Sequence, residues 1–216
     1  GEAGAIVHTD AVQAAGRMTF DLSASGAVLA SLSAHKLGGP QGVGALVLNA
    51  EIPILSQLKG GGQERGRRAG TENTAGIVGF GVAARLARDE LGQMDSVANL
   101  RDAMEAMLIQ ALPDAVVFGD GVARLPNTSC FAVPGLRSET QIMALDLAGI
   151  AVSSGSACSS GKVTPSHVLL AMGVPEALAG CAIRVSLGPE NTKDDVARLI
   201  TVLSDLSART GRRPAA

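Results

Sequence analysis

The stretch from Ala27 to Lys36 reads AVLASLSAHK, and two glycines follow it after Leu37. Its part up to Ser33 is short and mostly apolar, which is typical of a buried β-strand. Similar runs recur along the chain and alternate with helical patterns, so the sequence predicts an α/β fold. Several runs are apolar almost throughout, as expected for strands that are covered on both faces. The expected strands are Ala5–His8, Ala27–Ser33, Gly44–Leu48, Ala115–Phe118, Thr128–Val133, Ile150–Ser153 and Ala182–Leu187.

Helix-start signals stand out in the second half of the chain. A long Ala/Gly-rich helix gives way to a fresh helix start near residue 95, so we expect a domain boundary that divides residues 1–95 from 96–216. The expected helix starts are an Asp95 cap, a capping box at Ser138–Gln141, an N-cap with proline at Thr164-Pro165, and a last helix from Thr192.

The composition is that of a globular protein. Hydrophobic residues make up 46% and charged residues 18% of the 216 residues, so the chain can bury a core. The net charge is −2 and no basic stripe is interleaved with aromatic residues, which argues against a nucleic-acid partner. No apolar run approaches the roughly 20 residues needed to cross a bilayer, which argues against a membrane protein. The start carries no signal-like segment, so we expect a cytoplasmic protein, or one whose targeting segment lies in sequence missing here. Because the start also lacks Met, we expect the chain to begin within a larger protein.

Lys36 is the first residue that suggests chemistry. An ammonium group at the end of an apolar strand is costly to bury without a partner. One interpretation is a strand end whose Lys tip is solvated. The other is a lysine that forms a Schiff base, because partial desolvation makes its amine nucleophilic.

Polar residues near other strand ends favour the second interpretation. If pyridoxal phosphate is bound, Asp10 at the end of an earlier strand could pair with its protonated pyridine nitrogen, at the carboxyl edge of a parallel sheet. Taken alone, Asp10 reads as a helix N-cap and Gln13 as a surface amide. Gln13 could instead donate to the phenolic oxygen of the ring. Ser33 and His35 would share a face if the strand continues that far, and both are candidates to bond the phosphate.

The three cysteines, Cys130, Cys158 and Cys181, match no metal-binding spacing, and we expect no metal site. An odd number also argues against a disulfide framework. Cys158 stands in the turn-rich segment Ser153–Gly161, where it has no apolar partners, so it should be exposed and mobile. Cys130 and Cys181 lie in or next to expected strands and are assigned to packing.

Five motifs in this order resemble those of cysteine desulfurases of the NifS/IscS type. The resemblance covers nearly the whole chain, and five motifs in register are far more specific than any one of them. It implies the aminotransferase-like fold of type I pyridoxal-phosphate enzymes. Residues 1–95 would be the C-terminal part of the large cofactor-binding domain, and residues 96–216 the small C-terminal domain with the cysteine loop. The motifs are DAVQ at 10–13, SAHK at 33–36, GGQERGRRAGT at 61–71, SSGSAC at 153–158 and IRVSLG at 183–188.

The same resemblance assigns roles to single residues. It implies that the enzyme converts L-cysteine to L-alanine and transfers the sulfur as a persulfide to Cys158, for iron–sulfur cluster assembly or tRNA thiolation. It implies a homodimer and a sulfur-acceptor protein, such as an iron–sulfur scaffold or a thiol carrier. Lys36 would hold the cofactor through the Schiff base, and Thr71 would reach the cofactor of the partner subunit. Arg184 would bind the substrate carboxylate. The remaining cofactor contacts would come from Asp10, Gln13, Ser33 and His35.

The chain also departs from this family. The family has a long N-terminal segment, with a histidine that stacks on the cofactor ring, and no matching residues are present here. Three alternatives therefore stay open: a selenocysteine lyase, another enzyme of the class V aminotransferase type, and an inactive truncated fragment that acts as a scaffold. Arg184 could also form an ion pair at a strand edge.

Overall fold

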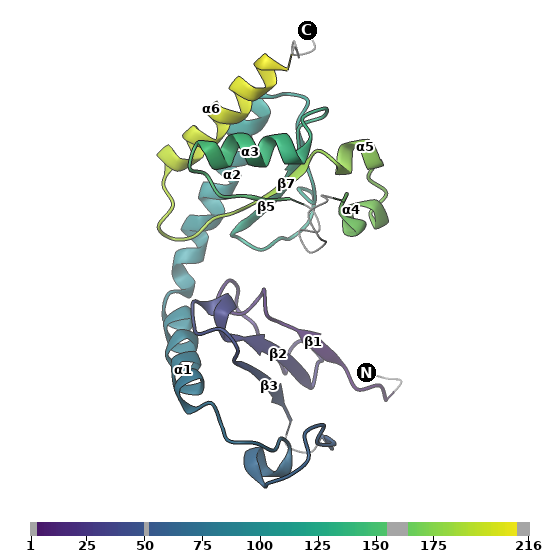
Figure 1. The fold of residues 1–216 in the computed structure, drawn as a ribbon, viewed down its shortest axis with the longest axis vertical. Helices are drawn as coiled ribbons and strands as arrows, with labels where there is room; N and C mark the ends of the chain where they lie inside the picture. The colour runs from purple at the N-terminus through teal and green to yellow at the C-terminus, as the bar shows by residue number, and fades with distance from the viewer. Residues whose placement is uncertain (1–3, 50–51, 155–163, 211–216) are drawn as a thin grey trace. The chain divides into compact units, whose positions relative to one another are not determined.

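The computed structural model describes residues 4–49, 52–154 and 164–210. The chain divides into two compact units, residues 1–92 and 93–216 (Figure 1). Both units combine helices with a sheet, which confirms the predicted α/β class. Among the residues that the structure describes, no helix is both long and apolar enough to cross a membrane.

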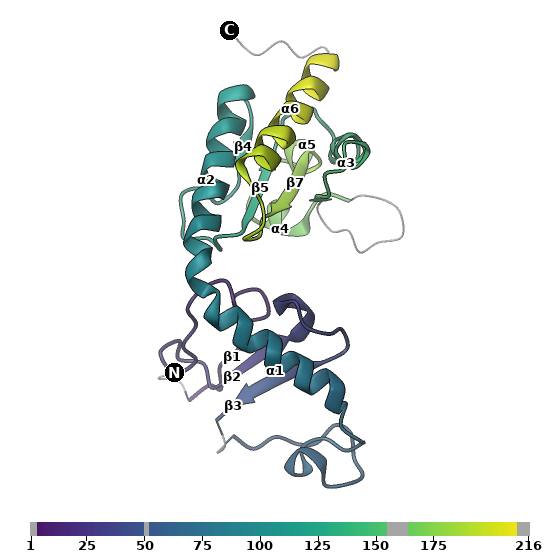
Figure 2. The same ribbon diagram turned by 90° about the vertical axis from the view of Figure 1, so that its left-hand side faces the viewer.

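The first unit is built on a three-stranded sheet in the order β1-β2-β3. β1 and β2 run parallel, and β2 and β3 run antiparallel. Helix α1 crosses one face of this sheet (Figure 2). The elements are β1 (His8–Asp10), β2 (Leu29–Ser33), the 3₁₀ helix η1 (Ala34–Leu37), β3 (Gly44–Leu48), the 3₁₀ helix η2 (Gln63–Gly66) and α1 (Thr74–Asp89).

Small residues let α1 approach the segment that follows β2. A Cβ on Gly39 would lie 3.0 Å from the Cβ of Ala83, and one on Gly79 would lie 2.9 Å from Pro40. Gly38 ends η1 in the left-handed region (φ 80°), where a residue without a Cβ is favoured. The glycines after Lys36 therefore end η1 within about one turn and let this segment pack closely against α1.

The second unit is a four-stranded sheet in the order β4-β5-β7-β6, with every neighbouring pair antiparallel. Its long helices α2, α3 and α6 pack with this sheet around one apolar core, which includes Met104, Leu108, Phe131, Ile183 and Leu203. The elements are η3 (Leu91–Gln93), α2 (Met94–Ala111), β4 (Val116–Val117), β5 (Thr128–Ala132), α3 (Ser138–Leu147), β6 (Ser153–Ser154), α4 (His167–Ala171), α5 (Glu176–Ala179), β7 (Ala182–Ser186) and α6 (Lys193–Arg209).

The predicted strands differ in accuracy. Gly44–Leu48 is confirmed as predicted. The first strand, expected at Ala5–His8, instead begins at His8, where backbone pairing with β2 starts. The expectation that strands are covered on both faces is wrong for β3, in which residues 44–47 are exposed.

The helix starts required more correction. Asp95 lies inside the first turn of α2, and Gln93 occupies the N-cap without a side-chain hydrogen bond. The capping box at Ser138 is wrong, because Ser138 is buried and donates its backbone N–H to the carbonyl of Gly180 (3.0 Å). Ser166, not Thr164, caps α4. Thr192 is confirmed as the start of α6, where it forms a reciprocal capping box with Asp195.

Candidate active site

The carboxyl ends of β1 and β2 bring the first candidate residues together. Asp10 ends β1 and is the register partner of Ser31 on β2. Its carboxylate accepts a hydrogen bond from the backbone N–H of Val12 (3.0 Å), so it also stabilises the turn that carries Gln13. The residue is exposed, and within residues 4–49, 52–154 and 164–210 no other hydrogen bond or ion pair occupies its carboxylate. One carboxylate oxygen is therefore available to a ligand.

The segment after β2 carries the lysine. Strand pairing ends at Ser33, so His35 lies on η1 and not on a continued strand. The two side chains nevertheless meet, with 2.9 Å between Ser33 Oγ and His35 Nδ1. Lys36 is half-buried on the same short helix, and its amine has no hydrogen-bond or ion-pair partner in the described part of the chain. A hydroxyl, an imidazole and an unpaired amine thus lie within four residues of one strand end.

Two residues at this edge were not predicted from the sequence. The Nε2 atom of the His8 imidazole lies 2.9 Å from the hydroxyl of Ser31, and this contact links β1 to the register partner of Asp10 on β2. The guanidinium of Arg17 donates to the carbonyl oxygens of Gln13 (3.1 Å) and Lys36 (3.2 Å). A lone histidine in a strand and a lone arginine after a glycine carry no pattern that marks them in the sequence.

The glycine-rich segment before α1 holds a strained backbone. Glu64 (φ 50°) and Arg65 (φ 57°) are consecutive non-glycine residues in the left-handed region. Thr71 follows this segment and is exposed, and no hydrogen bond joins it to the β1–β2 edge among the residues that the structure covers. Asn73 then caps α1 by accepting from the backbone N–H of Gly76 (3.1 Å). The segment is therefore anchored directly after Thr71.

Arg184 lies on β7, between β5 and β6 in the four-stranded sheet of the second unit. On β7 it is the register partner of Cys130 on β5 and of Ser153 on β6, so the three side chains share one face of the sheet. Arg184 is exposed, while Cys130 is half-buried. Burial raises the pKa of the Cys130 thiol, although the nearby charge of Arg184 opposes this shift. Cys130 therefore favours the neutral thiol.

The other two cysteines differ in what the structure says of them. Cys158 lies outside the described residues. Cys181 is buried, and its thiol donates to the carbonyl of Ala177 (3.3 Å), which confirms its assignment to packing.

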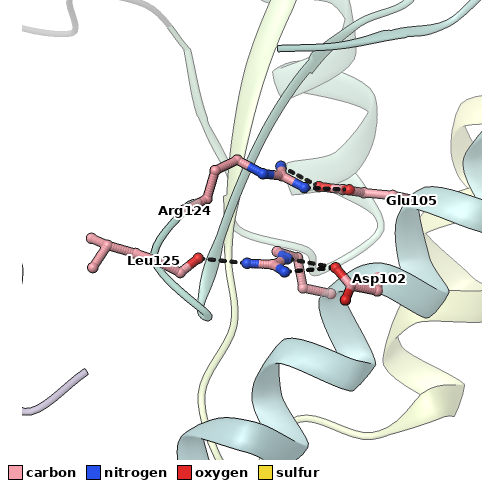
Figure 3. A network of polar contacts seen from close by, with 5 residues as sticks. Asp102, Glu105, Arg124 and Leu125 are labelled. Carbon is pink, nitrogen blue, oxygen red and sulfur yellow. Dashed lines mark hydrogen bonds and ion pairs between the residues drawn. The ribbon is translucent and has the colours of Figure 1, made fainter. Parts of the chain in front are cut away.

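An ion-pair network braces the second unit away from Arg184. Arg124 makes a bidentate pair with Glu105 on α2 (both 2.8 Å), and Arg101 donates to the carbonyl of Leu125 (2.7 Å) and pairs with Asp102 (Figure 3). Burial alone raises the pKa of Glu105, but hydrogen bonding to Arg124 and its charge outweigh this and lower it. Every charged group in this network is paired within the network, so we interpret it as structural.

Comparison with known proteins identifies the family. The aminotransferase class-V family model matches residues 1–199, so the chain belongs to the aminotransferase class-V family. The chain is 48% identical over 201 residues to a cysteine desulfurase of Sinorhizobium fredii, a match that covers 93% of this chain and 52% of the relative. It is 44% identical over 209 residues to the cysteine desulfurase NifS of Azotobacter vinelandii, covering 96% of this chain and 52% of that protein.

Solved structures agree with the fold. The chain matches the X-ray structure of a NifS-like protein from Rickettsia africae with a TM-score of 0.86 and 35% identity, over 96% of this chain and 55% of that chain. This confirms the predicted aminotransferase-like fold. The chain spans about half the length of the curated relatives that it matches.

The family depends on pyridoxal phosphate, and the residues at the β1–β2 edge fit this group. An available carboxylate oxygen on Asp10 suits a protonated pyridine nitrogen, and the unpaired amine of Lys36 suits an aldehyde. The linked hydroxyl and imidazole of Ser33 and His35 suit a phosphate.

Proposed function

We propose that this chain forms the C-terminal half of a cysteine desulfurase, which converts L-cysteine to L-alanine and transfers the sulfur to Cys158. The observation that carries the proposal is the β1–β2 edge, where Asp10 ends one strand, Ser33 ends its parallel neighbour, and His35 and Lys36 follow directly after Ser33. The similarity to cysteine desulfurases, in sequence and in order of motifs, supports it.

Six residues would hold the cofactor in this proposal. Pyridoxal phosphate, when bound, supplies an electron sink that stabilises negative charge at the substrate Cα. Asp10 would bind the pyridine N–H, and its own bond to the backbone of Val12 fixes the orientation of its carboxylate. Gln13 would donate to the phenolic oxygen. Ser33 and His35 would bind the phosphate, Lys36 would anchor the aldehyde carbon, and Thr71 would reach the phosphate of the partner subunit's cofactor.

Arg184 and Lys36 would handle the substrate. The guanidinium of Arg184 is exposed on its sheet face and can accept a carboxylate in a bidentate fork. The half-buried Lys36 amine would remove and return the proton at the substrate Cα, a role suited to a lysine whose amine is not held in an ion pair.

Cys158 would receive the sulfur. Its thiolate donates an electron pair to the substrate sulfur to form an S–S bond, while the substrate Cβ–S bond breaks. The electron pair of the broken bond stays with the carbon skeleton, which takes up a proton and leaves as alanine. Carbon is reduced and sulfur is oxidised to the persulfide level, so the step needs no external oxidant. Because the thiolate is the reactive form, we expect sulfur transfer to fall as the pH drops below the pKa of this thiol.

The two compact units would then be parts of two domains. We propose that residues 1–95 belong to the large cofactor-binding domain and residues 96–216 form the small domain with the cysteine loop. The proposed enzyme is a cytoplasmic homodimer that passes the persulfide sulfur to an acceptor protein, for iron–sulfur cluster assembly or tRNA thiolation.

The test of this function measures both products in the intact protein. Wild-type protein loaded with pyridoxal phosphate and given L-cysteine should release alanine and carry a persulfide on Cys158, located by alkylation and peptide mapping. Cys158→Ala should keep the bound cofactor but lose sulfur transfer. Cys130→Ala is the matched control and should retain the persulfide on Cys158. Equal sulfide release by wild type and Cys158→Ala would rule out the role of Cys158.

A further inference from the structure

Arg17 joins two segments that carry candidate cofactor residues. Its Nη1 donates to the carbonyl oxygen of Gln13 (3.1 Å) and its Nη2 to that of Lys36 (3.2 Å). Gln13 lies in the turn after β1, and Lys36 lies on η1 after β2, 19 residues from Arg17 in sequence. One guanidinium group therefore connects the segment behind Asp10 to the segment that holds the lysine.

The bond to Lys36 supplies a partner that the short helix cannot. The last carbonyl groups of a helix have no partner within it. Gly38 and Gly39 both donate their N–H groups to the carbonyl of Ala34, so they leave the carbonyl of Lys36 to Arg17. A 3₁₀ turn of four residues has little stability of its own, which makes an external donor at its end important.

Arg17 does not serve as an ordinary ion-pair residue. Within the described ranges, no carboxylate lies within ion-pair distance of its guanidinium. Partial burial lowers the pKa of the guanidinium, so the residue bears a desolvation cost without a counter-charge. The neighbouring Gly16 allows the turn that carries Arg17 to pack closely against η1, because a Cβ at this position would lie 2.8 Å from the side chain of Leu37. The local packing thus holds Arg17 against the end of η1.

We propose that Arg17 is a positioning residue, which fixes the backbone of Lys36 relative to the Asp10–Gln13 segment and so directs the lysine amine toward the cofactor aldehyde. This inference rests on the proposed function, because it assumes that Lys36 anchors the cofactor. Loss of the guanidinium should leave the amine chemically intact but place it less often at the reactive carbon.

The test is timed borohydride trapping of the intact protein with pyridoxal phosphate, with adducts located by peptide mapping. Arg17→Gln should lower the initial rate of adduct formation on Lys36 by about tenfold, as expected when a hydrogen bond from a charged donor is lost. The fraction of adduct on the other lysines should rise correspondingly. Arg17→Lys, which can serve only one carbonyl at a time, should give an intermediate rate.

Asp21→Ala is the matched control. Asp21 accepts from the backbone N–H groups of Ser23 (2.8 Å) and Ala24 (3.2 Å) in the same unit, but touches none of the candidate cofactor residues. It should lower stability without slowing the trapping of Lys36. If Arg17→Gln traps Lys36 as fast as wild type, or slows it no more than Asp21→Ala does, the inference is wrong. If wild type itself forms no adduct on Lys36, the proposed function fails, and the inference with it.

A second readout needs no cofactor and covers the case in which Arg17→Gln does not fold. Hydrogen exchange in the apo Arg17→Lys variant should be faster by several-fold in the peptide that spans residues 34–39, where the N–H of Gly39 closes η1 onto Ala34 (2.9 Å). Unchanged exchange in this peptide would contradict a role for Arg17 in holding η1.

Discussion

The two units of the chain differ in how they are stabilised and in what they carry. In the second unit, α2, α3, α6 and the four-stranded sheet enclose one continuous apolar core, whose fully buried large side chains include Met104, Leu108, Phe131, Ile183 and Leu203. In the described part of the first unit, the buried apolar side chains are five alanines and Phe80. β3 is exposed along most of its length. The second unit therefore has the more self-sufficient core.

Most of the candidate site residues lie in the first unit, which has the smaller apolar core. Four of the candidate cofactor residues, Asp10, Ser33, His35 and Lys36, lie at the thinly packed β1–β2 edge of the first unit, where hydrogen bonds rather than apolar burial fix the local geometry. The second unit carries Arg184, which the proposed function assigns to the substrate carboxylate, on the exposed face of a strand whose other side is buried. The comparison shows that large buried apolar side chains stabilise the second unit, whereas the first unit has small buried residues and polar side chains at the strand ends.

The largest expected effect tests the core of the second unit. Leu108→Ala should lower the free energy of unfolding by about 2–5 kcal/mol, because the side chain is fully buried and its removal leaves a cavity. Leu147→Ala, at a position that is 85% exposed in the same unit, should change it by less than about 0.5 kcal/mol. Urea unfolding followed by circular dichroism measures both. Similar losses in the two variants would contradict the assignment of the core.

The ion-pair network should contribute less than the core. Glu105→Gln should lower the free energy of unfolding by about 1.5–3 kcal/mol, because it removes the charge opposite the largely buried Arg124. The folded-state pKa of Glu105 is lowered, so its contribution is present above the unfolded pKa of about 4.3 and is lost as the pH falls through the folded pKa. The difference between wild type and Glu105→Gln should therefore shrink from pH 5 toward pH 3.

The control for this prediction lies on α1. Arg88 and Asp89 form a pair whose side chains are 75% and 54% exposed, so Asp89→Asn should change stability by less than about 1 kcal/mol. A loss as large as that of Glu105→Gln would show that burial does not distinguish the two pairs.

The smallest expected effect concerns the strained segment of the first unit. Arg65→Gly should raise the free energy of unfolding by up to about 1 kcal/mol, because it relieves a left-handed conformation (φ 57°) that disfavours a Cβ. Arg68 lies in the same segment but has no positive φ. Arg68→Gly should instead lower the free energy of unfolding by about 0.5–1 kcal/mol, because glycine gives the unfolded chain more conformational entropy to lose on folding. Thermal unfolding of the two variants checks the signs, and equal signs would remove the argument for strain.

The sequence predicted the strands better than it predicted the helix starts. Gly44–Leu48 was predictable because turn residues flank an apolar run, and Thr192 because its reciprocal bond with Asp195 is local. Ser138 looked like a cap but is buried against Gly180, a tertiary contact that no local pattern contains. Arg17 was missed for the same reason, since its partner Lys36 is distant in sequence. Motif order made Lys36 and Arg184 candidate site residues, and this remains a prediction; only strand register places Cys130 and Ser153 beside Arg184.

The most direct test of the account is the site of cofactor attachment. The chain contains four lysines, at positions 36, 59, 162 and 193, so borohydride reduction of the protein with pyridoxal phosphate, followed by intact mass and peptide mapping, can distinguish them. The account predicts one adduct per chain, on Lys36, and none in Lys36→Ala. Adducts spread over the other lysines, or an adduct that persists in Lys36→Ala, would contradict the assignment of the β1–β2 edge as the cofactor site.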